Sequence, residues 1–292
     1  MSLTERSNFN HLVLDIAWFG LALAATSRFL SVFAIRLGAD ANDLGLMSSL
    51  PNLVLMVSSS LAVWWRLRYE TSQRALTLPG VGFRMVFLLP ALTPFMPEPL
   101  QIPWLIFSVT LPAIPQGIAG AVFLTLMRES VSTDKMTALT SRRQVGLNAG
   151  IAAGALGFGI MLESLPFPLN YQLMFVIAFM FALMSHWHVL RVKTLYPSHV
   201  EKRQPSPRPR VPALKRGEGA ALWKNANFRV VLMCVFVMHL AFFTTVALVP
   251  LHLVENLNAN EAFIAAFGMV ELLSGMLIAT QTDKLVRFIG ER

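Results

Sequence analysis

Residues 168–190 read PLNYQLMFVIAFMFALMSHWHVL, a block without a single Asp, Glu, Lys or Arg. A helix of this length rises roughly 34 Å, enough to cross the roughly 30 Å hydrocarbon core of a bilayer. The whole chain shares this composition: of its 292 residues, 55% are hydrophobic and 14% charged, and the mean hydropathy is +0.57. Soluble domains carry about 25% charged residues, so we exclude a soluble enzyme, a disulfide-stapled secreted domain and a disordered chain.

Eight such blocks are predicted to be transmembrane helices. They cover residues 10–34, 43–65, 80–97, 100–127, 144–162, 168–190, 228–251 and 259–281. Prolines at 90, 94, 112 and 115 are expected to kink the third and fourth blocks, because each removes a backbone hydrogen bond. The predicted fold class is an all-α polytopic membrane protein.

The basic residues gather in alternate connections between the blocks. With the N-terminus placed inside, 22 of the 24 Lys and Arg residues fall on the inner side, Arg36 lies outside and Arg28 lies within a block. The inner set includes Arg84, assigned to the connection between the second and third blocks, and Arg143, assigned to the connection between the fourth and fifth. The positive-inside rule therefore predicts a cytoplasmic N-terminus in a plasma or inner cell membrane. This placement accounts for the pI near 10.2 without a nucleic-acid partner.

One long polar stretch divides the chain. We expect a six-helix bundle over residues 1–195, a cytoplasmic Pro/Arg-rich linker over 196–227, and the start of a second bundle over 228–292. Four prolines between positions 205 and 212 favour an extended linker, for which a PxxP docking site or an anionic-lipid contact is the alternative. The pair Asn227-Phe228 repeats Asn8-Phe9 after 219 residues, which indicates parallel repeats.

Two glycine-containing motifs lie in the fourth and fifth blocks. Gln116-Gly117 stands in the fourth block, and Gly146, Gly150 and Gly154 follow at a spacing of four in the fifth. Glycines on one helix face let a second helix approach closely. Gln116 is also a candidate hydrogen-bonding group for a solute, although a packing role is the simpler interpretation.

With these motifs the chain resembles the major facilitator superfamily of secondary transporters, which has six plus six helices joined by a long cytoplasmic loop. Gln116 is similar to part of the family's fourth-helix motif, and the three glycines resemble its glycine-rich fifth helix. Asp283, Arg287 and Gly290 resemble the loop whose acid and bases gate the cytoplasmic side. Ala113 stands where the family usually has an arginine.

The resemblance implies alternating access by two bundles around a midplane site, driven by a solute or ion gradient. The expected partners are a small-molecule substrate, the lipid bilayer and, as an open question, a coupling ion such as H+; the oligomeric state is also open. The chain corresponds to the first eight of twelve helices, so we expect a truncated product, a fragmentary gene model or a divergent short form. The alternatives are a truncated or accessory membrane protein without transport activity and, less favoured, a membrane-embedded enzyme.

Charged residues inside the blocks are the best candidates for function, because each costs roughly 2.5–3.5 kcal/mol to insert at a helix centre. Glu271 lies near the middle of the eighth block, while Asp15 and Arg28 lie in the first, about 20 Å apart along the helix. We expect Arg28 to face Glu271 or an anionic group of the substrate. Asp15 either reaches the cytoplasmic surface or contributes to an ion pathway.

The remaining signals are weaker. His239 in the seventh block could titrate near neutral pH or bond a neighbouring carbonyl. Cys234 is the only cysteine, so a disulfide framework or thiol metal site is not expected. The sequence lacks a phosphate-binding loop of the Gly-x-x-x-x-Gly-Lys type, so no nucleotide or other cofactor and no catalytic residue is predicted.

Overall fold

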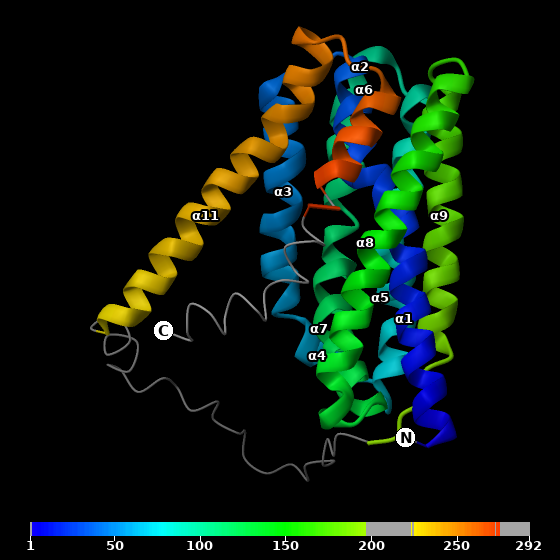
Figure 1. Cartoon of the computed structure of the whole chain (residues 1–292), viewed down its shortest axis with the longest axis vertical. Helices are drawn as coiled ribbons and strands as arrows, with labels where there is room; N and C mark the ends of the chain where they lie inside the picture. Colours follow the sequence, from blue (N-terminus) through cyan, green and yellow to red (C-terminus); the bar gives the residue numbers. More distant parts are fainter. Residues whose placement is uncertain (1, 197–222, 224, 272, 275–292) are drawn as a thin grey trace. The chain divides into compact units, whose positions relative to one another are not determined.

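The computed structural model describes residues 2–196, 223, 225–271 and 273–274, and every regular element among them is helical (Figure 1). The α-helices are α1 (Leu3–Ala24), α2 (Leu30–Arg36), α3 (Ala41–Ser59), α4 (Ala62–Arg66), α5 (Ser72–Arg84), α6 (Glu98–Thr110), α7 (Ala113–Ser130), α8 (Thr133–Ser164), α9 (Leu169–Leu190) and α11 (Ala226–Leu251). Shorter π- or 3-10 helices are η1 (Ala25–Phe29), η2 (Met85–Phe87), η3 (Leu89–Phe95) and η4 (His252–Asn256). A further helix covers residues 261–271. The predicted all-α fold class is confirmed.

Within the described residues, four helical segments are long and apolar enough to cross a membrane. They are Leu3–Arg36, Glu98–Ser130, Thr133–Ser164 and Leu169–Leu190. Ser72–Phe87 and Leu89–Phe95 make a fifth if this pair, bent by 42°, counts as one span. Helices also lie in the second, seventh and eighth predicted blocks, the last described only to residue 274.

Several predicted helix bounds were wrong because hydropathy reports only the apolar part of a helix. The third helix begins at Ser72 rather than at residue 80. The Thr71 hydroxyl accepts a hydrogen bond from the Arg74 N–H at 3.2 Å and so caps the polar first turn of this helix. The fifth begins at Thr133 rather than at residue 144. The predicted second helix is two helices, α3 and α4.

The regular α-helix is interrupted near prolines in the third and fourth segments, and the third segment is bent by 42°, whereas Pro115 lies inside α7. Pro90 and Pro94 lie in the 3-10 helix η3, after which the chain turns into α6. Pro112 stands at the break between α6 and α7. Since proline cannot donate the helical hydrogen bond, the regular α-helix is interrupted at these points.

Glycines allow a close contact between α8 and α1. Helix α1 packs between α8 and α9, and α7 packs between α3 and α5. A Cβ added at Gly154 would stand 2.6 Å from the Leu21 carbonyl oxygen, and one added at Gly150 would collide with the Ala17 carbonyl oxygen. Gly20 of α1 lies opposite, where a Cβ would stand 3.1 Å from the Gly150 Cα. Gly146 is looser, with Ile16 Cγ2 at 3.5 Å.

The chain forms two compact units, residues 1–198 with 250–292, and residues 199–249. The described part of the second unit is residue 223 and 225–249, most of it in α11. The two charged sites described below belong to the first unit. The predicted domain boundaries at 195 and 227 stay a prediction, and most of the predicted linker lies outside the described residues.

Candidate functional site

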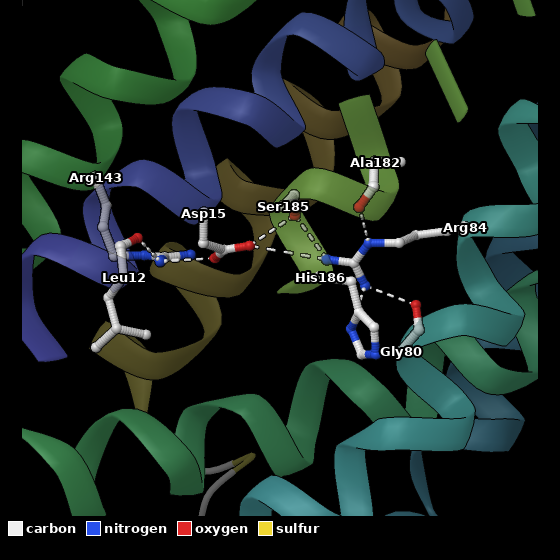
Figure 2. Close-up of polar contacts among 8 residues, drawn as sticks. All are labelled: Leu12, Asp15, Gly80, Arg84, Arg143, Ala182, Ser185 and His186. Carbon is white, nitrogen blue, oxygen red and sulfur yellow. Dashed lines mark hydrogen bonds and ion pairs between the residues drawn. The ribbon is translucent and has the colours of Figure 1, made fainter. Parts of the chain in front are cut away.

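Asp15 of α1 is the acidic centre of a buried cluster of charges (Figure 2). Its Oδ2 accepts a bond from Arg143 Nη1 at 3.0 Å, and its Oδ1 accepts one from the Ser185 hydroxyl at 2.7 Å. Arg84 Nη2 lies 3.8 Å from Oδ1. The alternative that Asp15 reaches the cytoplasmic surface is therefore wrong: the side chain is only 6% exposed, because two arginines of the bundle hold it inside.

Arg84, the last residue of α5, is buried among backbone acceptors. Nε donates to the Ala182 carbonyl at 2.7 Å, Nη1 to the Gly80 carbonyl at 2.6 Å, and Nη2 to the Ser185 hydroxyl at 2.7 Å. Its predicted place in a connection was wrong, because Arg84 is the last residue of α5 and is buried in the bundle.

Arg143 of α8 lies on the other side of Asp15 from Arg84 (Figure 2). Its Nη1 also donates to the Leu12 carbonyl, and its guanidinium carbon lies 4.7 Å from the centre of the Phe123 ring. Arg143 was likewise assigned to a connection, and the early start of α8 at Thr133 corrects this. The neighbouring Arg142 is exposed.

A cavity of about 220 Å³ lies against this cluster. Asp15, Arg84, Arg143, His186 and Gln116 line it, so the structure brings Gln116 of α7 to the same cavity as Asp15. Most of the remaining lining is apolar, including Phe19, Phe83 and Phe123. The cavity thus combines buried charges with an apolar wall, as binding sites for small organic molecules do.

Arg28 and Glu271 form a second charged site. Arg28 Nη1 lies 2.6 Å from Glu271 Oε2, which is the pairing considered from the sequence. Arg28 sits in the π-helix η1, and Gly268 leaves room for its guanidinium, because a Cβ there would stand 2.9 Å from Nε. Close by in sequence, Arg36 Nη2 lies 2.6 Å from Glu261 Oε1. Both pairs join α1–α2 to the helix at 261–271.

The other predicted residues do not join either site. His239 lies on α11, with Nδ1 2.8 Å from the Val235 carbonyl oxygen. Asp283, Arg287 and Gly290, the gate-like loop, lie outside the described residues. Gly146, Gly150 and Gly154 lie at the contact between α1 and α8.

Sequence reasoning missed four members of the buried cluster: Arg84, Arg143, Ser185 and His186. The available signal was the position of both arginines at the edge of an apolar block, within one or two helical turns of its predicted start. Charge counting treats such residues as part of a connection. Only the packing of α1 against α8 and α9, and of α5 against α9, shows that they face Asp15.

Comparisons with known proteins agree on the architecture. The model of the Major Facilitator Superfamily matches residues 17–290. No curated protein matches the chain. Among solved structures, the crystal structure of a D-xylose-proton symporter matches with a TM-score of 0.64 and 16% identity, over 96% of this chain and 70% of that chain. At this identity the match supports the fold alone.

Proposed function

Because the chain belongs to the Major Facilitator Superfamily, we propose that it moves a small solute across a membrane by alternating access, driven by a solute or ion gradient. The observation that carries the proposal is the cavity lined by Asp15, Arg84, Arg143 and Gln116. Charges inside membrane bundles are costly to insert and in transporters commonly mark the path of a solute or ion. The family match and this cavity favour a transporter over an enzyme.

Uptake into proteoliposomes tests transport directly. The full chain is purified, reconstituted and assayed with labelled D-xylose, an amino acid and an aromatic carboxylate, with and without an imposed proton gradient. D-xylose is included because the matched structure is a D-xylose-proton symporter. We expect saturable uptake of at least one solute above that of empty liposomes. Stimulation by the proton gradient would identify H+ as the coupling ion.

Cysteine accessibility tests alternating access without a known substrate. Cys234 is the only cysteine, so Gln116→Cys in a Cys234→Ser background gives a single reporter in the cavity. We expect membrane-impermeant thiol reagents to label it from either side of oriented vesicles. Leu105→Cys is the control that stays unlabelled, since Leu105 is fully buried in α6. Labelling from one side only, together with no uptake, would favour the accessory membrane protein.

The proposed orientation has a cytoplasmic N-terminus in the plasma or inner membrane. Removing Arg84 and Arg143 from the 22 inner basic residues leaves 20, still far more than Arg36 alone. The same reagents should therefore label Ser2→Cys from the cytoplasmic side and Asp40→Cys, in the connection before α3, from the opposite side. The reverse pattern would contradict this orientation.

A further inference from the structure

The cluster at the cavity carries more positive than negative charge. Asp15 of α1 is the one carboxylate there, and it faces both Arg84 of α5 and Arg143 of α8. The polar groups contributed by α9 and α7, Ser185, His186 and Gln116, bring no formal negative charge. One guanidinium in the described cluster therefore has no carboxylate of its own.

Other half-buried or buried arginines of the described chain differ in this respect. Arg28 has Glu271 at 2.6 Å, and Arg66 has Glu129 at 3.2 Å. An uncompensated charge in a low-dielectric interior is strongly unfavourable, so a buried excess of one positive charge favours an anion. This distinguishes the Asp15 cavity from the Arg28 site, which was the candidate for an anionic group in the sequence.

The unused hydrogen-bond donors point to where that anion would bind. Arg84 gives bonds from Nε, Nη1 and Nη2 to the protein. Arg143 uses only Nη1, and within the described residues its Nε and Nη2 have no hydrogen-bond partner. His186 Nε2 is buried without a partner in the same part of the chain. These atoms belong to residues that line the cavity.

The rest of the wall sets the character of the ligand. Ile16, Phe19, Leu76, Phe83, Phe123 and Val189 provide apolar surface. The volume of about 220 Å³ is below the roughly 300–1,000 Å³ of pockets that hold drug-sized ligands. A small molecule with one anionic end and an apolar body matches this cavity.

We propose that the cavity binds a small organic monocarboxylate, whose carboxylate accepts hydrogen bonds from Arg143 Nε and Nη2 and whose apolar body lies against the phenylalanines. A planar guanidinium matches a carboxylate through two parallel bonds. The assignment of this ligand as the transported solute rests on the proposed function. Binding itself does not.

Binding of benzoate to the purified full chain in detergent tests the proposal, with benzamide as the neutral analogue and chloride as the inorganic anion. Isothermal titration at constant ionic strength gives the Kd. We expect benzoate to bind, and benzamide and chloride to bind at least about tenfold more weakly. Arg143→Gln should weaken benzoate binding by about 10- to 100-fold, the loss expected for a charge-assisted donor. Arg142→Gln, an exposed neighbour on the same helix, should retain it.

Arg143→Lys keeps the charge and removes the two parallel hydrogen bonds of the guanidinium, so it should bind benzoate with intermediate affinity. It also provides a test of the site if Arg143→Gln does not fold. Equal binding of benzamide, unchanged binding by Arg143→Gln in a folded protein, or no benzoate binding would overturn the proposal. Binding of chloride as tightly as benzoate would overturn the proposal that the ligand is an organic carboxylate. Benzoate binding without uptake of any solute would contradict the proposed transport and support the proposed carboxylate site. Uptake of D-xylose without benzoate binding would support transport and contradict the carboxylate site.

Discussion

At the scale of the residue, Asp15 is expected to stabilise the bundle, because its carboxylate is the acidic partner of both Arg84 and Arg143 in the described cluster. Asp15→Asn keeps the size of the side chain and removes its charge, leaving the buried Arg84 and the largely buried Arg143 without a carboxylate. We expect the free energy of unfolding to fall by about 3–5 kcal/mol, the usual cost of breaking a buried ion pair. Chemical unfolding in detergent micelles measures it.

The exposed pair Glu70–Arg74 supplies the matched control. Its atoms are 2.9 Å apart but both side chains are mostly exposed, so Glu70→Gln should change the free energy by less than about 1 kcal/mol. In the double variant Asp15→Asn/Arg143→Gln, removal of one of the two arginines should recover part of the loss. Strictly additive losses would show that Asp15 and Arg143 are not coupled.

At the scale of the residue, the sequence predicts which charged residues lie inside apolar blocks better than it predicts the residues that they contact. Asp15, Arg28 and Glu271 stand out because each interrupts an apolar block, and the Arg28–Glu271 contact follows from opposite charges with no other partner nearby in their blocks. Arg84 and Arg143 do not stand out, because a basic residue at the edge of a block is also what the positive-inside rule predicts. Only packing distinguishes the two cases.

At the scale of the element, the contact between α1 and α8 depends on the absence of side chains. Gly150→Ala places a Cβ against the Ala17 carbonyl oxygen, and backbone cannot move aside as a flexible side chain can. We expect a loss of about 1–3 kcal/mol, typical of overpacking, in the same unfolding measurement.

Gly157 of the same helix is the matched control for that substitution. A Cβ at Gly157 would have nothing within 4 Å, so Gly157→Ala should be neutral or stabilising by up to about 1 kcal/mol through helix propensity. Equal effects of the two alanines would mean that α8 does not depend on close approach to α1.

Sequence predicts the existence of the elements well and their ends less well. The spacing of Gly146, Gly150 and Gly154 predicts a packing face, and the prolines predict the bends. The starts of α5 and α8 could not be read from hydropathy, because the first turns of both helices are polar by the same measure as a loop. Arg84, at the end of α5, and Arg143, in the polar first part of α8, were assigned to connections and lie in the cluster instead.

At the scale of the whole molecule, alternating access requires some contacts to exist in one state only. Arg28–Glu271 and Arg36–Glu261 join the first helices to the helix at 261–271, which belongs to the predicted second bundle. If the two predicted bundles rock against each other, these are contacts that must break in each cycle. The charged cluster at Asp15, by contrast, lies entirely within the predicted first bundle and can stay intact.

Cross-linking separates these two kinds of contact. In a Cys234→Ser background, Arg28→Cys/Glu271→Cys joined by a short bifunctional thiol reagent should reduce uptake of the solute found in the proteoliposome assay to the level of empty liposomes, and reduction of a cleavable linker should restore it. Glu70→Cys/Arg74→Cys is the control, because these residues are four apart in the sequence, already in contact, and need not separate. Full uptake by the cross-linked Arg28/Glu271 pair would mean that this contact persists throughout the cycle, and the helix at 261–271 would then move together with α1.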